Sequence, residues 1–421
     1  MTATGWALVA LAVLGIGLTV AAITFVPWRS PRPTHSARER ALRDLPADMV
    51  AKGRALHASL RPSTYGSLLA GLVAPLLLGF TPAGAEIVAW AAQPFGGHWL
   101  AEALLGGLLV LMLVSVVSLP FGAWRYTVLR HYGLSTQSWG GWAVDVLKSS
   151  AVGAVISAVV LAGFYTVTHA APDWWWAFGA LGAAVAVVLL SFVFPVVVEP
   201  LFNTFAPMPD GPLRDELVAL AARDGMPVKE VLVADASRRT TGLNAYVSGL
   251  GATRRIVVYD TLLREAPPDE VRSVVAHELG HAKDRDPELG ALLGAIGAAA
   301  AVVALYLLGH WDALLRRAGV DSIGSPRAIG LVLAVMVVAG LVMDPAMNLA
   351  SRRIEARADQ HALRLTGDPA AFVAMQLRLA EVNIADVHPS RVEYVLFASH
   401  PDTVERVAAA REPTATADPR P

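Results

Sequence analysis

Long apolar stretches recur along this chain, and they restrict its fold more than any other feature. A helix of about 20 apolar residues can cross a bilayer. Hydrophobic residues make up 55% of the 421 positions and charged residues only 16%, so the composition is not that of a soluble protein. The first stretch has too long an apolar core for a secretory signal, and we interpret it as a retained span. We expect about seven transmembrane helices, near 5–27, 65–81, 99–119, 150–170, 175–198, 288–309 and 328–347.

The charges between these spans predict the orientation of the chain. Cytoplasmic loops carry an excess of Lys and Arg. The connection over 28–62 is strongly basic, whereas 82–98 contains Glu86 and no Lys or Arg, and the next connections continue the alternation. This pattern predicts an outside N-terminus, with 200–287 and the C-terminal tail in the cytoplasm. One predicted outer loop runs against the rule, because it contains Arg316, Arg317 and Arg327.

Hydropathy divides the chain into two regions. Residues 1–199 form an N-terminal membrane region with five predicted spans. Residues 200–411 form a mostly polar region that the last two spans interrupt, and the Pro-, Thr- and Ala-rich end, 412–421, is expected to be disordered. The polar region contains one amphipathic helix pattern and two short β-branched runs that predict strands, at 213–223, 230–234 and 255–259. The expected fold is a mainly α, polytopic membrane protein with a small β element.

Composition also restricts the function. A net charge of −1 argues against a general nucleic-acid role. The chain has no cysteine, which excludes thiolate metal sites, disulfides and cysteine catalysis. Any metal ion must therefore be held by histidine and carboxylate side chains.

Residues 277–281 read His-Glu-Leu-Gly-His and indicate a metal site. On a helix, His277 and His281 project from the same face, where both imidazoles can bind one ion. Glu278 lies beside the first histidine, where its carboxylate can reach a metal-bound water. Pro267 and Pro268 predict the start of this helix. The alternative is a surface helix on which two histidines coincide by chance.

A catalytic zinc site usually has three protein ligands and leaves the fourth position to water. Our candidate for the third ligand is Glu355, directly after the last span. Asp359 follows one helical turn later, where it could accept the free ring N–H of a histidine ligand. Without the histidine pair, this segment would read as a charged juxtamembrane helix with its arginines at the lipid headgroups.

The chain resembles the integral-membrane zinc metallopeptidases of the CAAX prenyl endopeptidase type, of which the heat-shock protease HtpX is a shorter relative. The resemblance runs from about residue 60 to 411, and seven spans match the CAAX branch better than the four-span branch. It rests on the histidine pair and on motifs elsewhere in the chain, which are Pro200-Leu-Phe-Asn203, Arg238-Arg-Thr-Thr-Gly-Leu-Asn-Ala-Tyr246, Arg254–Leu262, Ser351-Arg-Arg353, Glu355-Ala-Arg-Ala-Asp359 and Ser399-His-Pro401 with Arg406.

The resemblance implies a gluzincin-like peptidase domain and a role for individual residues. One zinc ion per chain would be bound by His277, His281 and Glu355, with Asp359 behind them and Glu278 activating the water. Asn244 would bind substrate on a segment that pairs with the peptide backbone. His400 and Arg406 would face the oxyanion side of the site. The chain departs from the family pattern at Gly242-Leu243, which makes the contacts near Asn244 less certain than the metal site.

Two further histidines are not promoted to ligands. His361 lies six positions after Glu355, which turns it away from that helix face, so a surface or supporting place is favoured. His388 precedes Pro389 and imitates His400-Pro401, but the segment after His400 fits the family pattern better.

The sequence thus predicts a multi-pass enzyme of the cytoplasmic membrane, a zinc endopeptidase with its active site toward the cytoplasm. Its partners would be the lipid bilayer and peptide or membrane-protein substrates, cleaved in quality control or in CAAX-type processing. Nothing in the sequence indicates the oligomeric state. Two alternatives remain, a multi-span transporter or channel and a non-catalytic metal-binding membrane scaffold.

Overall fold

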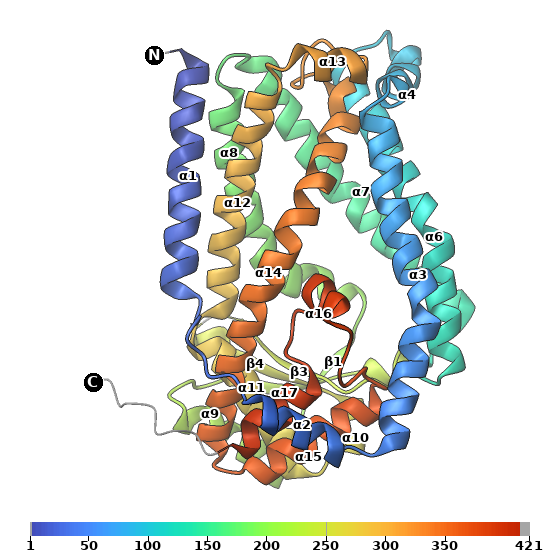
Figure 1. Ribbon diagram of the computed structural model, residues 1–421. Coiled ribbons are helices and arrows are strands. Elements are labelled where there is room, and N and C mark those ends of the chain that lie inside the picture. The colour runs from blue at the N-terminus through green and yellow to red at the C-terminus, as the bar shows by residue number, and fades with distance from the viewer. Residues whose placement is uncertain (1, 250, 413–421) are drawn as a thin grey trace.

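The computed structural model describes residues 2–249 and 251–412 (Figure 1). Among these residues, seven helices are long and apolar enough to cross a membrane. They span Ala3–Phe25, Ala47–Gly79, Trp99–His131, Trp139–Ala170, Trp175–Leu201, Asp286–Leu308 and Pro326–Thr366. The predicted mainly α, seven-span fold is confirmed.

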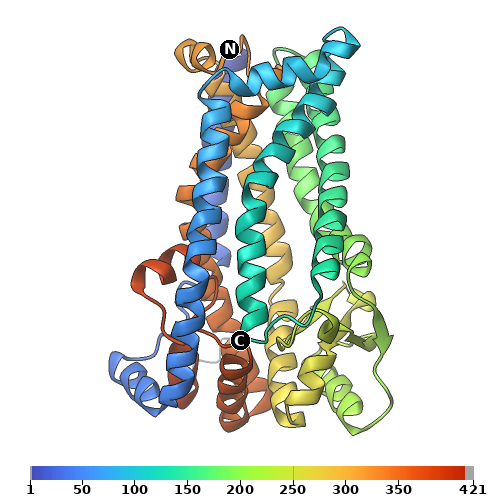
Figure 2. The same cartoon turned by 90° about the vertical axis from the view of Figure 1, so that its right-hand side faces the viewer.

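Two of these helices continue far beyond the apolar stretches that predicted them. Helix α3 covers Ala47–Gly79 and α14 covers Ile329–Thr366, so both run from the bundle into the polar half below it (Figures 1 and 2). Hydropathy reports only the part of a helix that suits lipid, and the polar extensions are stabilised by packing on the lower half. Through this extension, α14 positions Glu355 and Asp359.

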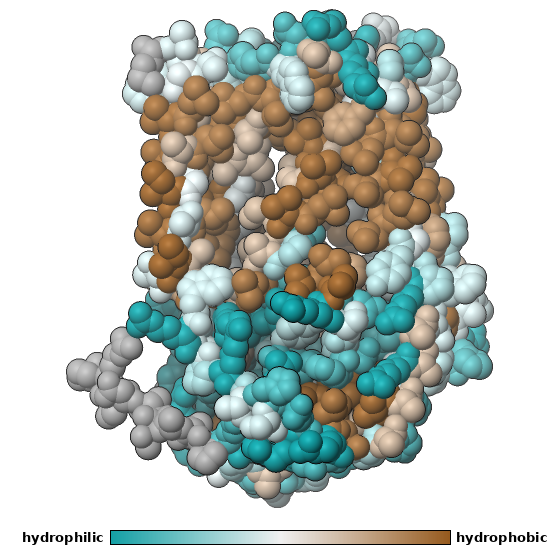
Figure 3. Space-filling view, viewed as in Figure 1, coloured by the Kyte–Doolittle hydropathy of each residue, from teal (hydrophilic) through white to brown (hydrophobic). Residues whose placement is uncertain are grey.

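The outer face of the bundle is apolar. Large hydrophobic side chains such as Val13, Leu147 and Val159 are more than half exposed. A lipid environment accepts this exposure, because lipid tails are as apolar as leucine. Figure 3 shows the resulting brown band, with polar surface above and below it and openings between the helices.

A four-stranded sheet lies in the lower half, in the order β1-β2-β4-β3. Strands β2 (Glu230–Ala234) and β4 (Arg255–Tyr259) are parallel and match the two predicted strands. Strands β1 (Phe205–Pro207) and β3 (Ala245–Ser248) pair antiparallel with them and were not predicted. They have three and four residues, which is too short for a period-2 pattern to emerge.

One hydrophobic core joins this sheet to the helices around it. It contains Leu217 of the predicted amphipathic helix, now α9 (Pro212–Arg223), with Ile256 of β4 and Phe372 of α15 (Pro369–Val382). Val275 and Leu279 of α11 (Pro268–Lys283) are fully buried in the same core. This packing fixes the orientation of α11, and the side of the helix away from this core can hold functional side chains.

Shorter helices complete the two ends of the molecule. At the polar end, α2 (His35–Asp44) packs on α17 (Thr403–Arg411), which contacts α16 (Arg391–Phe397) through Glu405 and Tyr394, and α10 (Asp260–Glu265) lies at the same end. At the opposite end lie α4 (Ala83–Ala92) and α13 (Asp312–Ala318). Of the tail expected to be disordered, Glu412 is described and its carboxylate accepts a hydrogen bond from the Thr34 amide. The rest, 413–421, lies outside the described residues.

Candidate metal centre and active site

Helix α11 presents His277, Glu278 and His281 on one side. It begins at Pro268, as the sequence predicted, and Asp269 and Glu270 in its first turn suit the positive end of the helix dipole. Because the histidines are four positions apart, their rings are neighbours along the helix and meet edge to face, with centroids 4.7 Å apart.

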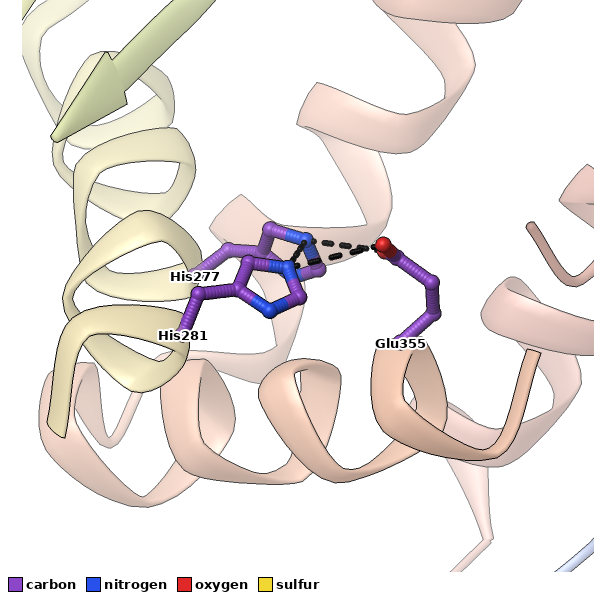
Figure 4. Close-up of side chains that lie close together, drawn as sticks. All are labelled: His277, His281 and Glu355. Atoms are coloured by element: carbon purple, nitrogen blue, oxygen red, sulfur yellow. Dashed lines mark hydrogen bonds and ion pairs between the residues drawn. The ribbon is translucent and has the colours of Figure 1, made fainter. Parts of the chain in front are cut away.

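Glu355 approaches this pair from α14 (Figure 4). Its Oε2 lies 3.2 Å from His277 Nε2, and its Oε1 lies 3.5 Å from His281 Nε2. The two Nε2 atoms are 3.1 Å apart. One donor atom from each of the three residues lies within 4.8 Å of the others, so the group could hold a metal ion.

Carboxylates hold the outer nitrogen of each ring. His277 Nδ1 lies 2.9 Å from Asp359 Oδ1, and His281 Nδ1 lies 2.9 Å from Asp286 Oδ2. An Nδ1–H donated to a carboxylate leaves Nε2 as an acceptor directed at the centre. Asp359 was a candidate for this place, but Asp286, the first residue of α12 (Asp286–Leu308), was missed. The sequence feature that could have identified Asp286 is an acidic residue five positions after His281, in the segment Lys283-Asp-Arg-Asp286.

The donor set suits a cation. Burial opposes the charged imidazolium, yet the carboxylates of Asp286 and Glu355 raise the pKa of His281 to about 10. Glu355 Oε2 is buried and has no hydrogen-bond partner among the described residues. Such an atom normally costs stability unless it coordinates an ion or accepts a hydrogen bond. Two imidazoles and one carboxylate are also typical zinc ligands.

Glu278 is partly buried beside this group. Burial raises the pKa of its carboxyl above the usual range, because the charged form loses hydration. A carboxylate with a raised pKa is a better proton acceptor near neutral pH than an ordinary glutamate.

Arg406 lies behind the histidines. Its Nε donates to Asp359 Oδ2 at 2.9 Å, and its side chain is only 13% exposed. The Gln376 amide, oriented with its oxygen toward the guanidinium, accepts from Arg406 Nε at 3.1 Å and from a terminal nitrogen at 3.0 Å. The guanidinium of Arg406 thus donates mainly to Asp359 and Gln376. Through these hydrogen bonds it holds the Asp359 carboxylate against His277.

His400 lies on the open side of the centre. Its Nε2 is 3.3 Å from Glu355 Oε1, and 59% of its side chain is exposed. His388 instead directs Nδ1 to Asp402 Oδ2 at 3.1 Å. The structure therefore brings His400, and not His388, to the candidate metal ligands.

Asn244 lies immediately before β3 and is exposed. Its carbonyl accepts a hydrogen bond from the Tyr259 amide at 3.0 Å. Within the described part of the chain, its side chain forms no hydrogen bond with His277, His281 or Glu355. β3 is an edge strand of the sheet, so one of its sides presents unpaired backbone groups.

Of the two places expected for His361, at the surface or in a supporting position, the structure excludes the surface. Its residue is 8% exposed, and Nε2 lies 3.0 Å from Asp224 Oδ2. From α14 it faces α11, where a Cβ on Gly280 would approach its ring to 3.1 Å. It is not part of the group that could hold a metal among the described residues.

The seven candidate membrane helices and the possible metal site of the described residues fit a membrane metalloprotease, and comparisons with known proteins show that class. The peptidase family M48 matches residues 207–414, and the CAAX prenyl protease N-terminal region, with five membrane helices, matches 63–204. The chain belongs to peptidase family M48, in its CAAX prenyl protease type. This membership decides against the transporter and scaffold alternatives.

Individual relatives support the assignment. A CAAX prenyl protease 1 homolog of Arabidopsis thaliana is 30% identical over 303 residues, which cover 70% of each chain. An uncharacterized metalloprotease, YhfN, of Bacillus subtilis (strain 168) is 29% identical over 317 residues, or 73% of each chain. The crystal structure of S. mikatae Ste24p has the same fold, with a TM-score of 0.79, 22% identity, and coverage of 97% of this chain and 99% of the other.

Proposed function

We propose that this chain is a zinc-dependent endopeptidase that hydrolyses peptide bonds at the cytoplasmic side of the membrane, with one zinc ion per chain. The observation that carries the proposal is the convergence of His277, His281 and Glu355, with Glu278 next to the first histidine. Two buried carboxylates on the outer ring nitrogens support it, because metal-binding histidines are usually oriented in this way.

The residues around the centre divide the work of hydrolysis. When bound, zinc would polarise the scissile carbonyl and lower the pKa of a bound water to about 7. Glu278 takes the proton of the attacking water and passes it to the leaving amine. His400, near Glu355 on the open side, donates to the developing oxyanion. Loss of one such donor typically lowers the rate by about 10²–10³.

Asn244 and Arg406 have different roles in this proposal. Asn244 binds substrate, and the peptide adds to the free edge of β3. Arg406 positions Asp359, and through it His277, because its hydrogen bonds go to Asp359 and Gln376.

Removal of the metal tests the proposal. Treatment of the purified protein in detergent with a strong chelator is expected to abolish cleavage of a quenched fluorescent peptide, and one equivalent of zinc is expected to restore it. The bound metal is measured by mass spectrometry before and after treatment. Full activity of a metal-free sample, checked by the same measurement, would contradict the zinc mechanism.

Asp286 provides a finer test of the centre. Asp286→Asn is expected to weaken zinc affinity by about 10- to 100-fold, because the partner that orients His281 loses its charge. A competition titration with a zinc-chelating dye measures this. Asp284→Asn is the matched control, since Asp284 pairs with Arg357 at 2.8 Å and not with either histidine. Equal affinities of the two variants would show that Asp286 does not support the metal.

The cytoplasmic orientation of the site is supported by the loop charges and, at the other end, by one ion pair and one hydrogen bond. The arginines that run against the charge rule include Arg327, which pairs with Glu102 at 2.7 Å, and Arg317, which donates to the Phe80 carbonyl at 3.2 Å. Held by the protein in this way, they weigh less in setting the orientation than free loop charges.

Single cysteines can test this orientation, because the chain has none of its own. In intact spheroplasts, a membrane-impermeant thiol reagent is expected to label Gln93→Cys at the outer end and to leave Lys229→Cys unlabelled. Both positions are exposed. After lysis, both should react. Labelling of Lys229→Cys before lysis would place the active site outside.

The substrates that we propose are membrane-associated polypeptides. Relatives that carry the name CAAX prenyl protease 1 support lipidated peptide tails, whereas removal of misfolded membrane proteins is the alternative within the same activity. Peptides that co-purify with an inactive variant, compared with those from wild-type membranes, would distinguish the two.

A further inference from the structure

A cavity of about 1040 Å³ lies beside the candidate metal centre. It is bounded by α2, α14, α16, α17 and the segment 31–33, which lies between α1 (Ala3–Phe25) and α2. Asp359 and Arg406 contribute to its wall, but the residues that could hold the metal do not line it. Its volume is at the upper end of the usual range for small-molecule sites, about 300–1,000 Å³.

Arginine is the most frequent charged residue of this cavity. Seven arginines line it, with five acidic residues. All five acids already have partners: Asp359 binds Arg406, Asp402 and Glu405 lie near Arg38, Glu39 lies near His35, and Glu412 accepts from Thr34. The seven arginines outnumber the acids by two, and none of the five acids pairs with the remaining arginines among the described residues.

Five of the arginines have no acidic partner within the described part of the chain, and they are Arg32, Arg352, Arg353, Arg364 and Arg391. Arg352 is the clearest case, since only 8% of the residue is exposed. Its guanidinium donates to the carbonyls of Tyr394 (3.1 Å) and Ala398 and lies 4.6 Å from the centre of the Tyr394 ring. A buried cation that is paired only with dipoles favours an anion beside it.

The cavity also lies where a membrane headgroup would be. Arg352 and Arg353 follow the apolar part of α14, and Leu349 lines the cavity one turn earlier. Figure 3 shows polar surface directly below the apolar band at the level of α14 and α2. At the boundary of a bilayer, basic pockets attract anionic headgroups.

We propose that this cavity binds a phosphate-bearing anion, supplied by the headgroup of an anionic phospholipid or by free phosphate. Guanidinium groups match phosphate oxygens with paired hydrogen bonds, so several of them around one cavity form a phosphate site. The proposal is independent of the zinc chemistry, because it rests on residues that do not touch the metal.

Native mass spectrometry of the detergent-purified protein tests this with two short-chain probes, dioctanoyl phosphatidylglycerol and dioctanoyl phosphatidylcholine. The cavity variant is Arg364→Gln/Arg391→Gln, whose two exposed arginines have no side-chain hydrogen bond or ion pair to another described residue. The matched control is Arg40→Gln/Arg43→Gln, which removes the same charge from exposed positions of α2 outside the cavity. Thermal unfolding checks the fold, and Arg32→Gln provides a second cavity variant on a separate segment.

Phosphatidylglycerol is expected to bind the wild type and the control equally, and the cavity variant about tenfold more weakly. Failure of 10 mM inorganic phosphate to displace it would assign the site to a lipid, and displacement would assign it to free phosphate. The proposal is overturned if the two double variants bind alike, or if phosphatidylcholine binds the wild type as well as phosphatidylglycerol does.

Discussion

Glu278→Gln is expected to lower kcat for peptide cleavage by about 10²- to 10⁴-fold or more, without loss of bound zinc. The amide has nearly the same shape as the carboxylate but cannot accept the proton of the attacking water. Because Glu278 lies next to His277 but is not one of the three candidate ligands, the metal should remain. The measurements are the rate on a quenched fluorescent peptide and the zinc content of the same sample.

Glu270→Gln on the same helix controls for a change of glutamate to glutamine elsewhere on α11. Glu270 is buried and pairs with Arg378, so this variant can lower stability, but it lies two turns from the centre. Its rate per folded molecule should stay within about twofold of the wild type. Cleavage at the wild-type rate by Glu278→Gln with zinc bound would refute the role of general base.

The second large effect is expected for Glu355→Ala, which should lose both zinc and activity. A third protein ligand is what separates a catalytic zinc site from a weak histidine pair, so its loss should reduce bound zinc from about one per chain to below about 0.1 after dialysis. The loss also leaves the two imidazoles without the carboxylate that faces both Nε2 atoms. Elemental analysis and the peptide assay measure the two effects.

Glu381→Ala, on the exposed surface of α15, is the control for loss of a carboxylate. It should keep its zinc and its rate. Zinc retained by Glu355→Ala at one per chain would mean that another residue completes the site, and His400 is the nearest further candidate, 3.3 Å from Glu355 Oε1.

Features that depend on local spacing could be predicted from the sequence. The i, i+4 histidines of α11 must share a helix face wherever that helix lies, and Pro268 could begin it because its missing N–H is not needed there. The spans could also be predicted, since about 20 apolar residues have few stable places other than a bilayer. Strand β3 could not, because four residues have no periodicity to detect.

Pairings between different helices or loops were harder to predict. Asp286 begins α12 and reaches back to His281 through a residue with positive φ, Arg285 (57°), which redirects the chain by a conformation rare outside glycine. His361 turns away from Glu355, as helix geometry required, but α11 packs over it and buries it against Asp224. Helix geometry gives the direction in which a side chain points, but it does not give which other segment packs on that side chain.

By itself, the sequence determined the seven membrane helices, the paired histidines with Glu278 and the chemistry that these residues can perform. All of these depend on residues that are close together in the sequence, within about the length of one transmembrane helix. Over that distance, helix geometry alone sets where the side chains point relative to one another. Only the tertiary structure showed that the predicted Glu355 and Asp359 reach the histidines, that Asp286 lies beside His281, and that arginines from α14, α16 and the segment before α2 surround one cavity. Those arrangements depend on how separate helices pack, and packing is settled by the sum of many weak contacts that no local pattern encodes.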